Sequence, residues 1–234
     1  MHARDDRTLC RKPQDADEAA PCMQPRARAQ RLRCGRPTSR GRPMLDCEAI
    51  YRKCPDPWRV RTDWYERRKR GLLIGSLTQP RYGRALELAC GNGAMTCVLA
   101  QRCDDLIAAD AAPTAVLLTE QAVREEGLAN VRVAVARVPA QWPAQEDAGL
   151  DLIVVSELAY YLAPHDLAQL LAQCAASLNQ GGEWVMCHFV KDFPERTRST
   201  RDIHADVDRI PGLAKVVSHQ DELFQLDVWR KQTS

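Results

Sequence analysis

The sequence lacks three features that would place it in a specialised class of proteins: paired cysteines, a long apolar run and an apolar leader. Ten cysteines occur among 234 residues, but none forms the Cys-x-x-Cys pair with which zinc sites often begin. Four of them lie within apolar runs, where a free thiol acts as a small hydrophobic side chain: Cys90, Cys97, Cys174 and Cys187. We therefore expect no metal site, and reduced thiols as in the cytoplasm.

Membrane and secretion signals are also missing. No stretch approaches the roughly 18 consecutive apolar residues that a membrane-spanning helix needs. Residues 1–20 lack the apolar core of a secretory signal. These absences predict a cytoplasmic protein without a membrane partner.

Charge is nearly balanced over the whole chain but not along it. The net charge is +2, whereas residues 1–45 alone carry ten Arg and one Lys against five acidic residues. Residues 46–234 are therefore net acidic, which argues against binding a phosphate backbone as their main task. Nucleic acid is accordingly an unexpected partner for this part of the chain.

Residues 1–45 also differ in composition, because Arg, Pro, Ala, Asp and Gln dominate there and aliphatic residues show almost no periodicity. Such a segment cannot bury enough apolar surface to fold alone. We predict a disordered basic extension over 1–45 and one folded domain over 46–234. A nucleic-acid tail, an organelle transit peptide and translated upstream sequence before a true start at Met44 are the alternatives.

The segment 85–100 carries the first sign of function. Residues 85–88 (ALEL) predict a short buried strand, and 91–93 (GNG) predict a turn in which two residues lack side chains. Residues 94–100 (AMTCVLA) predict the start of a helix. A strand, a glycine turn and a helix form the first unit of a nucleotide-binding α/β domain.

Two nucleotide-binding patterns compete at this turn. The dinucleotide pattern G-x-G-x-x-G fits poorly, because its sixth position counted from Gly91 is Thr96. The pattern acid-x-Gly/Ala-x-Gly-x-Gly is met by Glu87, Ala89, Gly91 and Gly93. In this respect the segment resembles motif I of the class I S-adenosyl-L-methionine (SAM)-dependent methyltransferases.

A carboxylate follows at a distance that suits nucleoside binding. Residues 106–110 (LIAAD) predict a second apolar strand that ends in Asp110, 17 residues after Gly93. A carboxylate at this strand end is placed to accept hydrogen bonds from both ribose hydroxyls. Capping of the helix that Pro113 opens is the alternative role, and one side chain can fill both.

Further elements follow from apolar runs and the residues that interrupt them. A helix with a basic outer face is expected from Trp64 onward. Helices are also expected over 113–126 and 166–178, and strands over 131–135, 150–156, 183–190, 214–219 and 222–230. Residues 179–182 (NQGG) predict a turn that ends the helix over 166–178. The last two strands suit an antiparallel hairpin that closes a seven-stranded sheet.

Residues 55–182 resemble the NodS family, the SAM-dependent N-methyltransferases of nodulation-factor synthesis. Three segments carry the resemblance: 56–59 (DPWR) with the helix that follows, 85–91 (ALELACG), and 151–162 (DLIVVSELAYYL). The resemblance implies a three-layer, Rossmann-like α/β fold with a mostly parallel seven-stranded sheet and an antiparallel C-terminal hairpin. It also implies SAM as the cofactor. The implied acceptor is the free amine of a deacetylated amino sugar of the chito-oligosaccharide kind, which would be a step in oligosaccharide biosynthesis.

The expected cofactor residues gather at the carboxyl ends of the strands, where ligands bind in open α/β sheets. They are Trp58, Tyr65, Glu87, Ala89, Gly91, Asn92, Gly93, Asp110, Ala111, Arg137, Val138 and Ser156. Two positions depart from the family pattern. Ala89 replaces the usual first glycine, and Arg137 stands where many such enzymes carry an acid that holds the adenine amino group. The adenine contact is then expected from backbone groups of Arg137 and Val138.

Methyl transfer to an amine needs alignment, a dry site and removal of a proton from the acceptor. Glu157, Tyr160, Tyr161 and His165 follow strand 150–156 and are the candidates for a base or an orienting group. Each has a structural alternative: Glu157 as a cofactor ligand or helix cap, the tyrosines as pocket wall or core, and His165 as the start of a helix. His188 is expected to be a buried histidine with satisfied hydrogen bonds.

Three other functions compete with N-methylation of a small molecule. They are a non-catalytic SAM-binding or scaffold domain, an O-methyltransferase of a small metabolite, and a nicotinamide-dependent oxidoreductase, which the glycine spacing disfavours. Methylation of a nucleic-acid base is not expected, because residues 156–159 (SELA) lack the Pro-Pro-aromatic step of nucleic-acid amino-methyltransferases.

Overall fold

The computed structural model of the protein describes residues 45–144 and 149–233. The extension expected over 1–45 therefore lies outside the described residues except for Leu45, and so does the alternative start at Met44. Both stay predictions.

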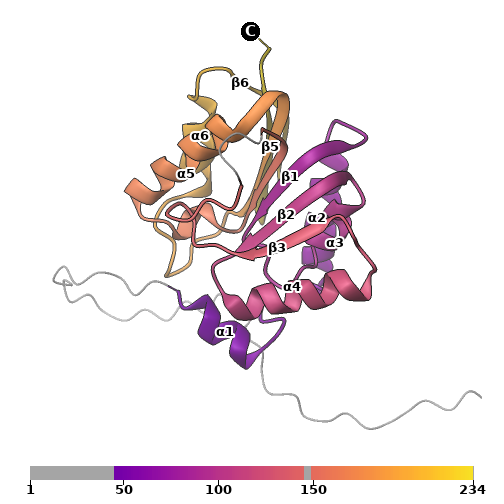
Figure 1. Cartoon of the computed structure of the whole chain (residues 1–234). Coiled ribbons are helices and arrows are strands. Elements are labelled where there is room, and N and C mark those ends of the chain that lie inside the picture. The colour runs from indigo at the N-terminus through magenta and orange to yellow at the C-terminus, as the bar shows by residue number, and fades with distance from the viewer. Residues whose placement is uncertain (1–44, 145–148, 234) are drawn as a thin grey trace, which may run out of the picture.

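One seven-stranded sheet forms the centre of the described structure, with the strand order β3-β2-β1-β4-β5-β7-β6 (Figure 1). The first five strands run parallel, and β7 pairs antiparallel with both β5 and β6. The strands are β1 Tyr82–Leu88, β2 Cys103–Asp110, β3 Val131–Val135, β4 Leu150–Ser156, β5 Leu178–Phe189, β6 Leu213–Gln220 and β7 Phe224–Lys231. This topology confirms the expected fold class.

Helices cover both faces of the sheet (Figure 1). On one face lie α5 (Pro164–Ser177) and α6 (Thr200–Asp208), and on the other α2 (Trp64–Ser76), α3 (Thr96–Ala100) and α4 (Pro113–Glu125). The remaining helices are α1 (Cys47–Lys53) and the short 3₁₀ turn η1 (Ala159–Tyr161). No helix in the described ranges is long and apolar enough to cross a membrane.

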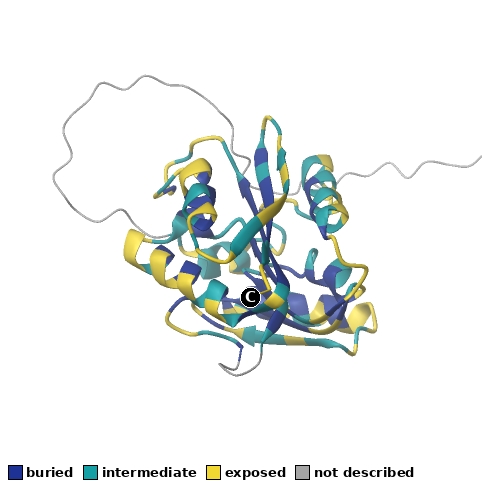
Figure 2. Ribbon diagram, turned by 90° about the horizontal axis from the view of Figure 1, so that it is seen from above, coloured by how far each residue is buried: buried dark blue, intermediate teal, exposed yellow. Residues whose placement is uncertain are grey.

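Alternation along β5 divides the apolar core into two clusters, one on each face of the sheet. Trp184 and Met186 pack with α5 and α6, whereas Val185 and Cys187 pack with α2 and α3. Successive side chains of a strand point to opposite faces, so a fully buried strand feeds both layers. Figure 2 shows buried residues along the sheet and exposed residues on the outer sides of the helices.

The helix starts follow ordinary capping chemistry. The Asp63 side chain accepts a hydrogen bond from Tyr65 N at the start of α2, and Ser199 caps α6 in the same way. Pro113 and Pro164 occupy the first turns of α4 and α5, where a missing N–H costs nothing. Helix α5 therefore begins two residues earlier than expected.

One expectation about the strands needs correction. Residues 179–182 do not form a turn before β5 but lie inside it, because β5 begins at Leu178. The glycine signal marks a bulge instead: the pairing with β4 shifts register between Leu150 and Leu152, and Gly181 has a φ of +76°. In the C-terminal hairpin, β7 is the inner strand and β6 forms the edge of the sheet.

Candidate active site

The glycine turn after β1 is built from residues with left-handed backbone. Gly91 and Gly93 have φ values of +60° and +80°, and Ala89 has a φ of +59°. Only glycine adopts this conformation without a steric cost, so the family pattern favours glycine here and Ala89 carries a strained backbone. At Gly93 a Cβ atom would lie 3.0 Å from the Thr119 Cα, so the missing side chain lets α4 approach the turn.

Asp110 ties the ends of β1 and β2 together. Its Oδ2 accepts a hydrogen bond from Gly91 N at 3.0 Å, and its Oδ1 accepts one from Ala112 N at 2.9 Å. The carboxylate is 8% exposed. Burial raises its pKa above the usual value, while these backbone hydrogen bonds oppose the rise. These bonds do not cap α4, because its N-cap is Ala112 and has no side-chain hydrogen bond, so the alternative capping role is not met; Ala111 lies next to the carboxylate at the same strand end.

Glu87 lies behind the turn rather than on its surface. Its side chain is 3% exposed and accepts a hydrogen bond from the Thr96 hydroxyl at 2.6 Å. Burial raises the pKa of Glu87 to about 8. This carboxyl group joins β1 to the first residue of α3, so its contact in the described structure is with the scaffold of the turn.

Helix α1, which the sequence did not predict, packs against the glycine turn after β1. The Tyr51 hydroxyl lies 2.7 Å from the position that a Cβ on Gly91 would occupy, so this glycine makes room for the tyrosine. The Trp58 ring packs edge-on against Tyr51 at 5.5 Å between centroids. Glu48 accepts hydrogen bonds from the Thr114 N and Oγ1 at the start of α4, which anchors α1 there.

Asn92 is held by the segment that follows α1. Its amide nitrogen donates to the Pro55 carbonyl and to the Asp56 carboxylate, at 3.2 and 3.1 Å. The Arg61 guanidinium donates to the Asn92 carbonyl at 2.6 Å. The side-chain oxygen of Asn92 is buried and has no hydrogen-bond partner among the described residues. A buried acceptor without a donor is costly, so this atom marks a place where a ligand group would fit.

The end of β3 offers fewer free backbone groups than expected. Arg137 is exposed, and its backbone N–H already donates to the Gln141 side chain at 2.9 Å. Val138 and Trp142 are both half-buried and pack against the core. The indole N–H of Trp142 is buried without a partner among the described residues. Trp142 was not predicted as a site residue, because nothing in its local sequence distinguishes it from a core tryptophan.

Glu157 is the most constrained residue after β4. Its φ is +55°, which is unusual for a residue with a side chain. Its carboxylate accepts hydrogen bonds from Lys69 Nζ at 2.8 Å, from Phe189 N at 3.3 Å and from the Tyr160 hydroxyl. Ser156 precedes it as the last, half-buried residue of β4. These contacts join β4, β5, η1 and α2 at one carboxylate.

Lys69 sits between two carboxylates. It is 4% exposed and lies 2.9 Å from Glu66 and 2.8 Å from Glu157. Burial alone would lower its pKa, but these two carboxylates raise it well above the usual value. Burial also raises the pKa of Glu66. The expected basic outer face of α2 thus needs correction at Lys69, which points inward.

Aromatic rings surround this charged group. Tyr160 is 3% exposed, and its ring centroid lies 4.7 Å from that of the half-buried Tyr161. The Tyr65 hydroxyl is buried without a hydrogen-bond partner among the described residues. His165 stands apart on α5: its side chain is 89% exposed and lies 3.5 Å from Asp166. The structure therefore joins Tyr160 to Glu157 by a hydrogen bond and to Tyr161 by a ring contact, and it places the Tyr65 ring 5.0 Å from Lys69 Nζ. His165 does not belong to this group.

Two half-sites thus lie along one edge of the sheet. The first is the turn after β1 with the carboxylate after β2, and the second is the charged and aromatic group after β4. Both lie at carboxyl ends of adjacent parallel strands, where open α/β sheets bind ligands. The described residues contain no group of three or more His, Cys, Asp or Glu that could hold a metal ion.

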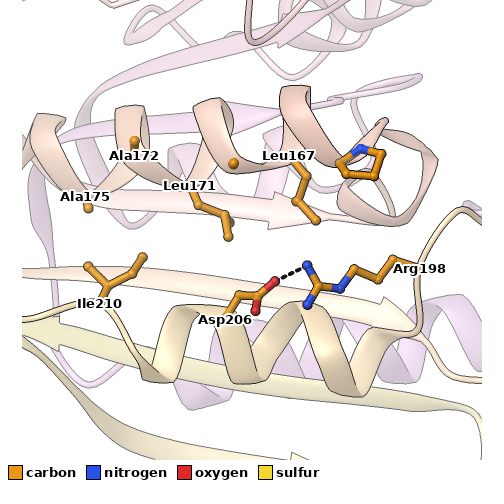
Figure 3. A pocket seen from close by; sticks show the side chains of 9 residues that line it. Leu167, Leu171, Ala172, Ala175, Arg198, Asp206 and Ile210 are labelled. Atoms are coloured by element: carbon orange, nitrogen blue, oxygen red, sulfur yellow. Dashed lines mark ion pairs between the residues drawn. The ribbon is translucent and has the colours of Figure 1, made fainter.

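A groove of about 370 Å³ lies away from this edge, between α5 and α6 (Figure 3). Ala175 and Leu171 of α5 lie above Ile210 across the groove, and Leu167 lies opposite the ion pair of Arg198 and Asp206. None of the residues that line this groove belongs to the expected site. Its apolar walls are continuous with the packing of the two helices.

Comparison with known proteins places the chain among methyltransferases. The family model described as a methyltransferase domain matches residues 85–182. Nodulation protein S of Sinorhizobium fredii is 36% identical over 126 residues, which cover 50% of this chain and 56% of that protein. The chain thus spans about half the length of the curated relatives that it matches.

Solved structures agree with this match. A Pseudomonas syringae protein whose structure is assigned to the methyltransferases is 36% identical, covers 72% of this chain over 99% of its own length, and superposes with a TM-score of 0.62. The N-methyltransferase NodS of Bradyrhizobium japonicum WM9, solved with S-adenosyl-L-homocysteine (SAH), is 23% identical. The superposition covers 80% of this chain and 99% of the NodS chain, with a TM-score of 0.69.

Proposed function

The chain belongs to the NodS-like class I methyltransferases, and we propose that it transfers a methyl group from SAM to an amine nitrogen of a small molecule. The observation that carries this proposal is the charged group after β4. Two carboxylates, Glu66 and Glu157, share one buried cation, Lys69. With both carboxylates ionised the group has an excess negative charge, which favours a cationic acceptor such as an ammonium group.

The residues after β1 and β2 fit the cofactor. In this proposal Asp110 binds the ribose, because its carboxylate stands at the end of β2 beside the glycine turn. The unpaired oxygen of Asn92 and the unpaired hydroxyl of Tyr65 are buried polar atoms that a bound cofactor or acceptor would satisfy. We propose that Val138 and Trp142 contact the adenine, because the Arg137 N–H already donates a hydrogen bond to the Gln141 side chain.

SAM, when bound, supplies a methyl group on a sulfonium that needs no metal for activation. The chain itself has to align the acceptor, exclude water and receive a proton. Glu157 is the residue proposed for this contact, because it is 30% exposed on the side chain while its neighbours hold it in place. Tyr160 and Tyr161 form the wall beside it.

Three hydrogen bonds to Glu157 favour an orienting role over that of a strong base. The hydrogen bonds from Lys69, Phe189 N and Tyr160 fix the direction of the Glu157 carboxylate, which suits a group that orients the acceptor. We propose that Glu157 holds the acceptor nitrogen by charge and hydrogen bonding, and receives its proton only transiently. His165 is not needed for this role.

The proposed acceptor is an amino sugar or a related small amine, on the strength of the resemblance to NodS and of the negative group after β4. Nucleic acid is disfavoured because residues 46–234 are net acidic. A cytoplasmic location is proposed from the reduced thiols of Cys47, Cys90, Cys97, Cys103, Cys174 and Cys187.

Labelled methyl transfer from SAM to glucosamine oligomers, to simple amines and to tRNA tests the acceptor class. Label on the nitrogen of a small amine supports the proposal, whereas label in tRNA alone or on an oxygen overturns it. Calorimetric titration with SAM and with a nicotinamide dinucleotide tests the cofactor. Binding of neither would favour a scaffold.

Glu157→Gln tests the residue at the transfer point. Loss of the charge should lower turnover, by about 10²–10⁴-fold if Glu157 also takes the proton of the acceptor, while the affinity for SAH changes little. The exposed Glu222→Gln serves as the control and should leave both unchanged. If SAH affinity falls together with turnover, Glu157 is a cofactor ligand rather than an acceptor contact.

A further inference from the structure

A chain of buried polar groups runs from β7 to the turn after β4. Asp227 Oδ2 lies 2.6 Å from His204 Nδ1, and His204 Nε2 lies 3.1 Å from His188 Nδ1. His188 Nε2 in turn accepts a hydrogen bond from the Ala159 N at 3.2 Å. All four residues are at most 1% exposed. At such burial each missing hydrogen bond would be costly, so the partners fix one another.

The backbone end of this chain determines where every proton lies. The N–H of Ala159 can only donate, so His188 Nε2 must be the bare, accepting nitrogen. A neutral His188 then carries its proton on Nδ1 and donates it to His204 Nε2. His204 therefore carries its own proton on Nδ1 and donates to the carboxylate of Asp227. Any other arrangement places two donors face to face or requires an imidazole anion.

The surroundings support a neutral His188 ring and a charged Asp227 carboxylate. Burial lowers the pKa of His188 well below its usual value, and nearby His204, Lys69 and Arg196 lower it further. Burial would raise the pKa of Asp227, but the hydrogen bond from His204 and other hydrogen bonds bring it below its usual value. Lys215 and Gln225 also lie near the Asp227 carboxylate, at 3.6 and 2.7 Å.

The chain ends at the wall of the proposed acceptor site. Ala159 is the first residue of η1, and the next residue, Tyr160, donates to Glu157. The Tyr160 ring packs edge-on against His188 at 5.3 Å between centroids. From the other side, Thr197 N donates to the Tyr160 carbonyl at 2.8 Å. The left-handed backbone of Glu157 therefore depends on contacts that surround η1 on both sides.

We propose that Asp227, His204 and His188 act as positioning residues, which hold the Ala159 N–H and thereby keep Glu157 and Tyr160 in the geometry that meets the acceptor. The function of this geometry rests on the proposed methyl transfer, but the hydrogen-bond chain itself does not. The unprotonated Nε2 of His188 accepts a hydrogen bond from the Ala159 backbone amide. The hydrogen-bonded series of Asp227, His204 and His188 therefore orients the site and offers no route for a proton toward Glu157.

The proton positions can be measured on the unmutated protein. Nitrogen-15 spectra of the imidazole rings should show both buried histidines neutral, with the proton on Nδ1 and a bare Nε2, between pH 6 and pH 8. Free histidine prefers the opposite tautomer, so this result would not arise by default. A proton on Nε2 of His188 would overturn the inference, whatever any variant does.

Three variants test the consequence for the site. His188→Phe keeps the ring volume but removes the acceptor, His188→Gln restores an acceptor, and Met186→Leu changes a fully buried neighbour on the same face of β5. Amide hydrogen exchange at residues 157–161 should become about tenfold faster in His188→Phe. It should be largely restored in His188→Gln and unchanged in Met186→Leu. Equal exchange in the Phe variant and in the Met186 control would refute the positioning role.

Kinetics separate this inference from the proposed function. The Phe variant should lose about tenfold or more in kcat/KM for the amine acceptor, while its Kd for SAH stays within about twofold of the unmutated value. Loss of SAH binding in proportion would mean general damage and would count against positioning. If the unmutated protein methylates no amine, the proposed function fails. The spectra and exchange rates still decide whether Asp227, His204 and His188 form the proposed hydrogen-bond series.

Discussion

At the scale of single residues, two carboxylates join the elements that meet at the carboxyl ends of the parallel strands. Asp110 joins β1 to β2 through Gly91 and Ala112, and Glu157 joins β4 to α2 and β5 through Lys69 and Phe189. Each of them both closes a turn and faces the region where a ligand is proposed to bind. Removing either carboxylate is therefore expected to weaken ligand binding by more than the loss of one ligand contact, because the turn that it closes is loosened as well.

Asp110→Ala should weaken SAM binding, because it removes the carboxylate proposed to hold the ribose and loosens the glycine turn. The expected loss is about 2–3 kcal/mol, or roughly 30- to 150-fold in Kd, measured by calorimetry. Asp105→Ala is the matched control, since Asp105 is an exposed carboxylate on the same strand. Affinity like that of the unmutated chain in Asp110→Ala would refute the ribose role.

Glu87→Gln should change how stability depends on pH. Burial raises the pKa of Glu87 from 4.5 to about 8. Between these values the folded state keeps a proton that the unfolded state has released, so the free energy of unfolding falls as pH rises through this window. Glutamine has no such proton, so the fall should flatten in thermal melts between pH 5 and pH 8. An unchanged slope would show that Glu87 titrates normally.

At the scale of elements, the approach of α4 to the glycine turn controls the first half-site. Gly93 has a φ of +80°, and a Cβ there would lie 3.0 Å from the Thr119 Cα. Gly127 has a similar φ of +64° but open space around it. The two positions therefore separate backbone strain from crowding.

Gly93→Ala should cost more stability than Gly127→Ala. Both substitutions incur a left-handed backbone penalty of about 1–2 kcal/mol, and Gly93→Ala adds about 1–3 kcal/mol for displacing α4. Urea denaturation measures the free energies of unfolding. Equal losses in the two variants would mean that α4 yields without cost.

Some elements could be predicted from local sequence and others could not. Strands β3 and β4 have the predicted bounds, because short apolar runs between polar residues define them. Helix α1 has no buried residue and helix α6 has only two buried aliphatic residues, Ile203 and Val207. Helix α1 therefore gives no apolar signal, and the apolar face of the nine-residue, mostly polar α6 is too short to mark it in the sequence.

The site shows the same limit. Asp110 and the glycine turn were predictable because the motif that contains them is continuous in sequence. The pairing of Lys69 with Glu157 was not, because 88 residues separate the partners. His188 was predicted to be buried with satisfied hydrogen bonds, which the structure confirms, but its partner His204 lies on a helix that the sequence did not reveal.

For the whole molecule, the described structure forms one sheet with two helical layers, and all of it lies after Met44. A chain that starts at Met44 keeps every described element. Its melting temperature and its Kd for SAM should therefore match those of the full chain, as measured by calorimetry. Loss of a cooperative melt in the shorter chain would show that the preceding residues contribute to the fold.

The order of the strands has a consequence for how the chain is made. Strand β6 precedes β7 in sequence but is joined to the sheet only through it, because β7 inserts between β5 and β6. During synthesis, β5 therefore waits with an unpaired edge while β6 has already emerged and has nothing to pair with. A product that stops before Phe224 would keep that apolar edge open and is expected to associate with other copies of itself.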